Sequence, residues 1–380
     1  MLQTILQLAF YTLVLFSCIS NHEDKKVFNG RITPGAENTT AYFDKLGGKS
    51  LGIIVNQTSM VQNKHLVDTL ISAGFNIKRI FAPEHGFRGT ADAGETVDDS
   101  IDDKTGIEIV SLYGKNKKPQ AEQLRGIDLL IFDIQDVGVR FYTYISTLHY
   151  VMEAAAENDI PVMVLDRPNP NRHIIDGPVL DPEFSSFVGM HQVPVLYGLT
   201  IGEYAMMING EQWLEKGMQC DLEVIPVLNY KANNAYVLPV RPSPNLPNQK
   251  SIVLYPGLCF FEGTSISVGR GTNHPFQHIG HPAFNVMDYS FTPFPNEGAK
   301  YPKHDGKRCY GHDLRSSTPP DRLDISYLIE YHKLAKEKNI PFFNDNNFFD
   351  KLAGTDKLKS QILSGESEDE IRLSWAEGLN

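Results

Sequence analysis

The sequence has few cysteines and no concentrated basic segment. Four cysteines occur in 380 residues, and Cys220, Cys259 and Cys309 are widely spaced, so neither a disulfide framework nor a structural zinc site is expected. Lysine and arginine number 35 against 46 acidic residues, a net charge of −11, and no basic run extends beyond residues 115–118. We therefore expect no nucleic-acid partner, because binding to phosphates needs a concentrated basic surface.

Three signatures of cofactor or metal chemistry are also missing. No Gly-x-Gly-x-x-Gly follows the first predicted strand at 51–55, and the chain contains no Walker A lysine motif and no His-Glu-x-x-His. Dinucleotide binding is therefore disfavoured, and no cofactor or metal is expected. A metal-dependent hydrolase, such as a deacetylase, stays open as an alternative, because His85, Asp133, Asp166 and His173 could converge in the folded chain.

The first 20 residues carry no charge, and their apolar stretch at 6–16 is too short to span a bilayer. This pattern predicts a signal peptide at 1–20 and export of the protein, followed by a linker at 21–45. Leu15-Phe16-Ser17-Cys18 resembles a bacterial lipobox. The protein is thus expected in the periplasm or at a membrane through a lipidated Cys18, with an unlipidated signal peptide as the alternative.

Apolar runs alternate with helical patterns along residues 46–228. Strands are predicted at 51–55, 77–82, 107–112, 128–132, 161–165 and 222–227, and helices at 64–73, 144–158 and 204–213. Thr200 and Glu203 form a potential capping box before the third helix. Continuous apolar strands require a sheet covered on both faces, which predicts an α/β fold with a Rossmann-like parallel sheet. Proline-rich and glycine-rich sequence at 229–380 predicts a second, smaller α+β domain.

Polar side chains follow five of the predicted strands. The carboxyl ends of parallel strands meet at one edge of a sheet, where such folds bind ligands, so these side chains predict a pocket. Carboxyl groups, amides and aromatic rings together suit a carbohydrate substrate. The residues are Asn56, Glu84, His85, Arg88, Tyr113, Asp133, Gln135, Asp136, Arg140, Asp166, Arg167 and Asn169.

Four long motifs then occur in order along the chain. They are Pro83-Glu-His-Gly-Phe-Arg-Gly, Asp133-Ile-Gln-Asp-Val-Gly-Val-Arg-Phe-Tyr-Thr-Tyr, Leu165-Asp-Arg-Pro-Asn-Pro and Glu262-Gly-Thr-Ser-Ile-Ser-Val-Gly-Arg-Gly-Thr. With these motifs the chain, from about residue 51, resembles the YbbC/NamZ family of exo-β-N-acetylmuramidases. The resemblance implies a Rossmann-like domain followed by an auxiliary domain, with the active cleft between them. It also implies release of N-acetylmuramic acid (MurNAc) from the non-reducing end of peptidoglycan fragments such as MurNAc-GlcNAc, where GlcNAc is N-acetylglucosamine.

Catalytic roles follow from the chemistry of glycoside cleavage. Glu84 is the expected general acid, because Phe81, Gly86 and Phe87 give it an apolar setting that suits a proton-donating carboxylic acid. Open candidates for the second group are the carboxylates of Asp133, Asp136, Asp166 and Glu262 and the 2-acetamido group of the substrate.

Binding roles are assigned to residues of the same motifs. Arg140 and Arg270 are candidates for gripping the lactyl carboxylate of MurNAc, because a guanidinium group matches a carboxylate bidentately. Tyr142 and Tyr144 could flank the sugar or could pack at a helix start. A sugar-binding lipoprotein without catalytic activity is the remaining alternative.

Overall fold

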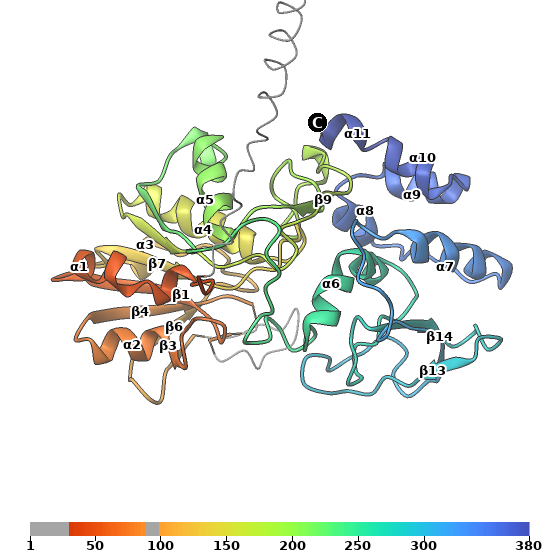
Figure 1. Ribbon diagram of the computed structural model, residues 1–380, viewed down its shortest axis with the longest axis horizontal. Coiled ribbons are helices and arrows are strands. Elements are labelled where there is room, and N and C mark those ends of the chain that lie inside the picture. Colours follow the sequence, from red (N-terminus) through yellow and green to blue (C-terminus); the bar gives the residue numbers. More distant parts are fainter. Residues whose placement is uncertain (1–29, 85, 88–98, 380) are drawn as a thin grey trace, which may run out of the picture. The chain divides into compact units, whose positions relative to one another are not determined.

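The computed structural model of the protein describes residues 30–84, 86–87 and 99–379. Its central element is a seven-stranded sheet, seen at the left of Figure 1. All neighbouring strands are parallel except β5, which pairs antiparallel with β6. This sheet confirms the predicted Rossmann-like α/β fold. The strands across the sheet are β11 (Leu222–Ile225), β8 (Val162–Leu165), β7 (Leu129–Asp133), β1 (Ser50–Val55), β4 (Asn76–Ala82), β6 (Glu108–Ser111) and β5 (Ser100–Ile101).

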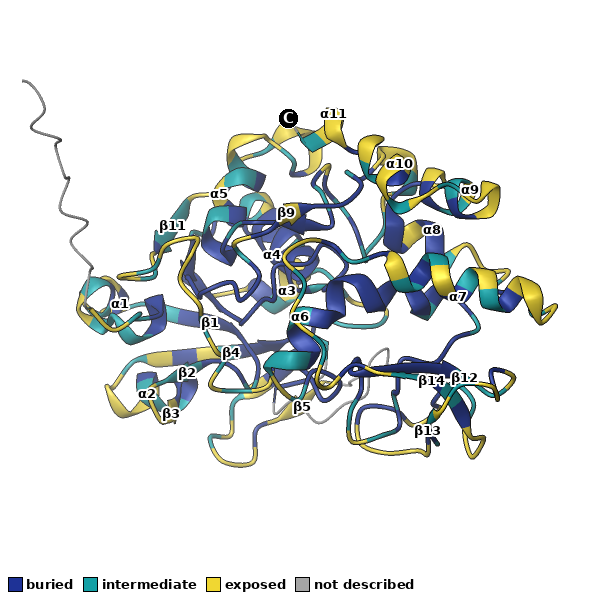
Figure 2. Ribbon diagram, turned by 45° about the vertical axis from the view of Figure 1, so that its right-hand side comes forward, coloured by how far each residue is buried: buried dark blue, intermediate teal, exposed yellow. Residues whose placement is uncertain are grey.

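A hydrophobic cluster lies on each face of the sheet, and Figure 2 shows many buried residues along its strands. Side chains along a strand point alternately to opposite faces, and Ile54 accordingly joins one hydrophobic cluster while Ile53 and Val55 join another. Helices α3 (Ala121–Leu124), α4 (Tyr144–Glu157) and α5 (Ile201–Gly210) contribute to the cluster of Ile54. Helices α1 (Phe43–Leu46) and α2 (Leu66–Ser72) contribute to the other. The central strands β1, β7 and β8 are therefore apolar at most positions.

Local signals in the sequence fix several helix ends. The Thr200 side chain accepts a hydrogen bond from the Glu203 amide, and the Glu203 carboxylate accepts one from the Thr200 amide, which confirms the predicted capping box of α5. Helix α2 begins two residues later than predicted, because Lys64 and His65 form strand β3 (Lys64–His65) with β2 (Met60–Val61). Gly74 follows α2 with φ of +84°, a left-handed conformation that favours glycine after a helix.

The chain beyond the sheet forms small sheets and short helices. Strands β12 (His278–His281), β14 (Cys309–Asp313) and β13 (Tyr289–Phe291) make a three-stranded antiparallel sheet, and β9 (Ile175–Asp176) pairs with β10 (Leu196–Tyr197). The helices are α6 (Gln249–Leu258), α7 (Ser326–Glu337), α8 (Phe348–Ala353), α9 (Lys357–Ser364), α10 (Glu368–Leu373) and α11 (Ala376–Leu379). The 3-10 helices of the chain are η1 (Gly35–Glu37), η2 (Thr39–Ala41), η3 (Pro182–Phe184), η4 (Glu215–Gly217) and η5 (Cys259–Gly263).

The sheet and the C-terminal elements share one hydrophobic core. The cluster on the α4 face of the sheet continues through α6, α7 and α8 to Trp375. Asp176 accepts a hydrogen bond from the Arg372 guanidinium at 2.6 Å, and the Gly354 carbonyl accepts one from the Asp181 amide at 2.8 Å. Residues 32–380 accordingly form one compact unit. These contacts hold the C-terminal elements in place beside the sheet.

The segment just before the sheet is folded onto it. Ala36, Tyr42 and Leu46 are fully buried in the core on the α2 side. The Gly35 amide donates to the Asp166 carbonyl at 2.7 Å, and a Cβ at Gly35 would lie 2.2 Å from the Ile225 carbonyl oxygen. The chain therefore needs glycine at this close approach. Residues 32–45, which we expected to belong to a linker, thus pack against the sheet.

Three of the four cysteines lie in the described part of the chain. Cys220, Cys259 and Cys309 are buried free thiols, as their spacing indicated. The described residues contain no helix with the length and apolar character needed to cross a membrane. The expected signal peptide, with Cys18, lies outside the described residues.

Candidate active site

A cavity of about 960 Å³ lies where the chain leaves β4 and β6. Its volume is at the upper end of the range of roughly 300–1,000 Å³ found for small-molecule sites. The sheet side of its wall is formed by Glu84, Tyr113, Phe141, Tyr142, Thr143, Phe187 and Val188. The C-terminal elements contribute, among others, Tyr255, Cys259, Glu262, Arg270, Phe276, Tyr301, Lys303, Phe348 and Leu352.

Glu84 stands in the wall of this cavity, two residues after β4. The Thr143 hydroxyl donates a hydrogen bond to Glu84 Oε2 at 2.9 Å. Thr143 is the N-cap of α4, so the start of a long buried helix fixes the donor that orients this carboxyl group. The Thr143 hydroxyl therefore fixes the orientation of the Glu84 carboxyl group in the cavity wall.

Aromatic rings form the buried lining of the cavity. Tyr255 packs edge-on against Phe141, Tyr142 and Phe276, with ring centroids 5.6, 5.9 and 5.0 Å away. The Tyr142 hydroxyl donates to the Pro242 carbonyl at 2.9 Å, which fixes its ring in the wall. Tyr144, the other tyrosine of the motif, lies behind Tyr142 and accepts a hydrogen bond from the Asn56 amide at 2.9 Å. Tyr142 therefore reaches the cavity, whereas Tyr144 supports it.

An ion pair lines the side of the cavity formed by the C-terminal elements. Arg270 Nε donates to Glu262 Oε1 at 3.0 Å, and the Arg270 guanidinium lies 5.0 Å from the centre of the Phe276 ring. Burial would raise the pKa of Glu262, but Arg270 and Lys303 outweigh burial and hold this pKa below its usual range. The ammonium of Lys303 donates to the Phe261, Thr264 and Ile266 carbonyls. Glu262 is thus an ionised carboxylate in the cavity wall.

Five predicted site residues line the cavity: Glu84, Tyr113, Tyr142, Glu262 and Arg270. Asp133 and Arg167 instead form a buried bidentate pair, in which Arg167 Nε and Nη2 donate to the two carboxylate oxygens at 2.5 and 2.9 Å. The Asn56 side-chain oxygen accepts hydrogen bonds from the amide and hydroxyl of Thr58. These groups tie together the ends of β1, β7 and β8 and leave no polar atom in the cavity wall.

The other polar residues after β7 and β8 are also committed to the fold. Asp166 accepts hydrogen bonds from the amides of Arg167 and Gly202 and from the Thr200 hydroxyl, so it holds the start of α5. Gln135 donates to the Asp136 and Pro168 carbonyls at 2.7 Å each. The Asn169 side chain bridges the Leu199 carbonyl and the Asn171 amide. The ends of β1, β7 and β8 therefore make a buried polar network, whereas those of β4 and β6 open into the cavity.

Asp136 is a buried acid at the centre of this network. One of its oxygens, Oδ2, accepts hydrogen bonds from the Gly138 amide at 2.6 Å and from the Tyr197 hydroxyl, while Oδ1 has no hydrogen-bond partner among the described residues. Burial raises the pKa of Asp136 to about 7, against the lowering effect of these hydrogen bonds. Asp136 is thus protonated in the folded protein under mildly acidic conditions.

Replacing Asp136 with asparagine should change how stability depends on pH. A folded-state pKa above the unfolded value gives a stabilising contribution that is complete below about pH 4 and is lost as the pH rises through 7. Asparagine is isosteric with the protonated acid and cannot ionise, so Asp136→Asn should gain on the order of 2–4 kcal/mol relative to wild type between pH 5 and pH 8. Denaturant unfolding at both pH values measures this difference. A constant difference between variant and wild type would contradict it.

Arg140 does not reach a ligand, contrary to its predicted role in binding a carboxylate. Its side chain is fully buried, and the guanidinium donates to the carbonyls of Pro178, Val193, Leu352 and Ala353. Two of these carbonyls belong to α8, so Arg140 joins the sheet side to the helix that places Leu352 in the cavity wall. Sequence alone does not reveal this role, because carbonyl partners more than 200 residues away leave no local signal. His85 and Arg88 lie outside the described residues.

Several residues of the cavity wall were not predicted from the sequence. Thr143 belongs to the second of the four motifs, and its place before a helical run indicates an N-cap. Its contact with Glu84 is visible only in the structure. Tyr255, Lys303 and Tyr301 come from the C-terminal elements and follow no predicted strand. No motif in their neighbourhood indicates that they face the same space as Glu84. Only the packing of the C-terminal elements against the sheet brings them there.

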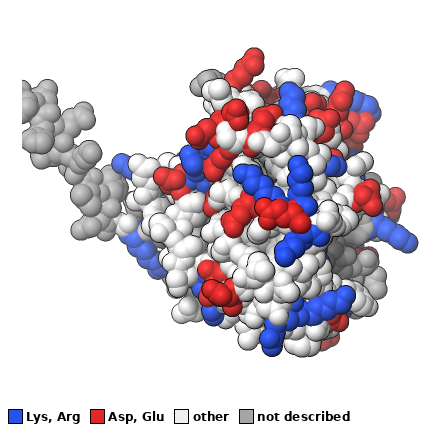
Figure 3. Space-filling view, turned by 90° about the vertical axis from the view of Figure 1, so that its right-hand side faces the viewer, with Lys and Arg blue, Asp and Glu red and all other residues white. Residues whose placement is uncertain are grey.

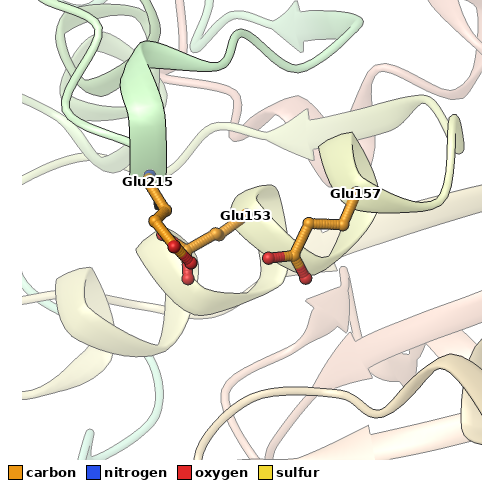
Figure 4. Close-up of side chains that lie close together, drawn as sticks. All are labelled: Glu153, Glu157 and Glu215. Atoms are coloured by element: carbon orange, nitrogen blue, oxygen red, sulfur yellow. Dashed lines mark hydrogen bonds between the residues drawn. The ribbon is translucent and has the colours of Figure 1, made fainter.

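One group of acidic side chains has the spacing of a metal site within residues 30–84, 86–87 and 99–379. It consists of Glu153 and Glu157 on α4 and Glu215 in η4, shown in Figure 4. The Lys118 ammonium donates to Glu153 and Glu157 at 2.7 Å each, and the Glu215 amide donates to Glu153. A lysine therefore already pairs with two of the three carboxylates, and the cluster lies apart from the cavity lining. The potential metal ligands Asp133 and Asp166 are engaged elsewhere, as described above.

One face of the molecule carries charges of both signs. On the face seen in Figure 3, lysine and arginine side chains are interspersed with aspartate and glutamate, and neither sign forms a continuous area. Surface pairs such as Arg315 with Asp313, at 2.7 Å, illustrate this mixing. The expectation that nucleic acid is not a partner rests on the sequence composition, and this face adds no basic groove.

Comparison with known proteins gives the family. A family model described as the N-terminal part of exo-β-N-acetylmuramidase NamZ matches residues 51–250, and the corresponding C-terminal model matches residues 253–380. The peptidoglycan β-N-acetylmuramidase NamZ of Bacillus subtilis (strain 168) is 40% identical to this chain over 366 residues. That alignment covers 89% of this chain and 86% of the Bacillus protein.

Two solved structures have the same fold along nearly the whole chain. A DUF1343 family protein from Bacteroides fragilis NCTC 9343 is 44% identical, with a TM-score of 0.85, and the match covers 92% of this chain and 96% of that protein. A second DUF1343 family protein from the same strain is 30% identical, with a TM-score of 0.76 and coverage of 91% and 95%. The family that the four motifs indicated is thereby confirmed, and the chain belongs to the NamZ family of exo-β-N-acetylmuramidases.

Proposed function

We propose that this protein is an exo-acting glycoside hydrolase that releases N-acetylmuramic acid from the non-reducing end of peptidoglycan fragments. The proposal rests on the position of Glu84, whose carboxyl group is oriented by Thr143 in the wall of a cavity large enough for a sugar. Family membership supports the same activity. In this role Glu84 protonates the glycosidic oxygen as the bond to the leaving sugar breaks.

A second catalytic group must act together with Glu84, and fewer carboxylates are candidates for it than the sequence alone suggests. Asp133, Asp136 and Asp166 are buried in the network described above and are absent from the cavity wall. Glu262 is the other glutamate in the wall, and its pairing with Arg270 keeps it ionised. We therefore assign the second role either to Glu262, as base or as stabiliser of positive charge, or to the 2-acetamido group of the substrate.

Recognition of muramic acid is assigned to Arg270. Its Nε atom binds Glu262, and no group among the described residues forms a hydrogen bond with its terminal Nη atoms. These atoms form the fork that matches a carboxylate, and MurNAc differs from GlcNAc by a lactyl group that ends in a carboxylate. The aromatic lining around Tyr255 and Tyr142 supplies apolar surface for the sugar ring.

One assay separates this proposal from the two alternatives. Purified protein incubated with MurNAc-GlcNAc should release the two monosaccharides at the same rate with and without a chelator. A sugar-binding protein without catalytic activity would bind the disaccharide and leave it intact. A metal-dependent hydrolase would lose activity in the chelator and regain it on addition of zinc.

Export and membrane attachment form a separate proposal, based on the uncharged N-terminal segment and on Cys18. If Cys18 is lipidated, the full-length protein should appear in the membrane or detergent fraction, and Cys18→Ser should shift it to the soluble fraction. Fractionation followed by immunoblotting measures the distribution. Soluble wild-type protein would refute lipidation and leave the signal peptide as the remaining interpretation.

A further inference from the structure

The residues that line the cavity differ widely in how far they are exposed to solvent. Tyr255 and Phe276 are buried, and the side chains of Glu262 and Arg270 are 24% and 23% exposed. Tyr301 lines the same cavity but is 96% exposed. Tyr301 therefore lies at the mouth of the cavity, whereas the charged groups proposed to act on the substrate lie deeper.

The backbone on both sides of Tyr301 is held firmly. Before it, Asn296 and Ala299 exchange two backbone hydrogen bonds, and the Asn245 amide donates to the Gly298 carbonyl at 2.6 Å. After it, the Lys303 ammonium donates to the Phe261 and Ile266 carbonyls at 2.9 and 3.0 Å. A large aromatic side chain is thus presented to solvent from an anchored segment.

Such an exposed, anchored tyrosine at a cavity mouth is a feature of binding surfaces, because its ring offers apolar area and its hydroxyl a polar tip at low entropic cost. An exo-acting hydrolase admits the terminal sugar of its substrate into the cavity. The rest of the substrate, on the far side of the bond that Glu84 would cleave, must then emerge through the mouth. The group that meets Tyr301 is accordingly the sugar that leaves.

We propose that the Tyr301 ring is a stacking platform for the sugar on the reducing side of the cleaved bond. This inference rests on the proposed function, which sets the direction of the substrate in the cavity. The ligand is the face of a pyranose ring with axial C–H groups, as in the N-acetylglucosamine unit of MurNAc-GlcNAc. The platform makes the affinity for a disaccharide depend on Tyr301, while the affinity for MurNAc alone depends on the deeper residues.

Calorimetric binding with and without the ring tests this proposal. In the Glu84→Gln background, which slows cleavage strongly, adding Tyr301→Ala should raise the Kd for MurNAc-GlcNAc about five- to tenfold and change the Kd for MurNAc by less than about twofold. Adding Tyr301→Phe should preserve the disaccharide Kd, because the ring remains. With Glu84 intact, Tyr301→Ala should lower kcat/KM for the disaccharide by the same factor, and Tyr301→Phe should retain it.

The matched control is Phe294→Ala, which removes another exposed aromatic ring, 57% exposed, that is not part of the cavity lining. This control should leave both Kd values unchanged. Equal losses for MurNAc and MurNAc-GlcNAc, or no loss for either, would overturn the platform while the hydrolase function stands. Failure of the wild-type protein to cleave the disaccharide would instead overturn the proposed function and this inference with it.

Discussion

Glu84→Gln is expected to reduce cleavage of MurNAc-GlcNAc by about 10²- to 10⁴-fold, the usual contribution of a general acid. Glutamine preserves the size of the side chain and its hydrogen bond with Thr143, which joins Thr143 Oγ1 to Glu84 Oε2 in the wild type. Only the transferable proton is lost. Steady-state kinetics on the disaccharide measure the effect, and thermal unfolding verifies that the variant is folded.

The same variant should retain much of its activity on a nitrophenyl N-acetylmuraminide. Nitrophenolate is a good leaving group and needs little protonation, so the loss of the acid matters less. In the pH profile for this substrate, the basic limb that reports the protonated acid should disappear in the variant, and the acidic limb should persist.

Equal slowing of both substrates would show that Glu84 is not the general acid. Glu84 would then act as nucleophile, binding group or structural residue. Thr143→Val offers a milder test of the orientation of Glu84. This variant removes the hydroxyl that donates to Glu84 Oε2 and should slow the disaccharide more than the nitrophenyl substrate.

Arg270→Gln is expected to reduce kcat/KM for MurNAc substrates by an amount that corresponds to about 2–5 kcal/mol, the range for loss of one partner of a desolvated charged pair. At about 1.4 kcal/mol per factor of ten, this is a loss of about 30-fold or more. The physical reason is that the lactyl carboxylate would enter the cavity without its guanidinium partner. N-acetylglucosamine analogues lack this carboxylate, so any activity on them should fall much less.

Two controls accompany the arginine substitution. Arg241→Gln breaks a comparable pair with Glu297, at 2.9 Å, that lies on the surface outside the cavity lining, and should leave kinetics unchanged. Arg270→Gln also leaves Glu262 without its pair, so unfolding measurements must show that the fold persists. If kcat/KM falls equally for MurNAc and N-acetylglucosamine substrates, Arg270 maintains the structure of the site and does not recognise the lactyl group.

Part of the fold and of the site follows from local signals in the sequence. Continuous apolar runs such as residues 51–55 predict strands buried on both faces, and six predicted strands are present as β1, β4, β6, β7, β8 and β11. Thr200 and Glu203 predict the start of α5 through bonds that span only three residues. Glu84 was identified because it follows a strand directly, and the four motifs identified the family.

Only the tertiary structure decides which polar residues face the cavity. The sequence places Asp133, Asp166 and Arg140 at strand ends with the same apparent status as Glu84, yet Asp133 pairs with Arg167, Asp166 caps α5 and Arg140 binds carbonyls of α8. Tyr301, which no pattern in the sequence indicated, reaches the same cavity as Glu84 from a segment more than 180 residues farther along the chain. The physical reason is the distance along the chain over which each kind of interaction acts. Periodicity and capping act over a few residues, whereas the partner that satisfies a buried charge is chosen by how distant segments pack.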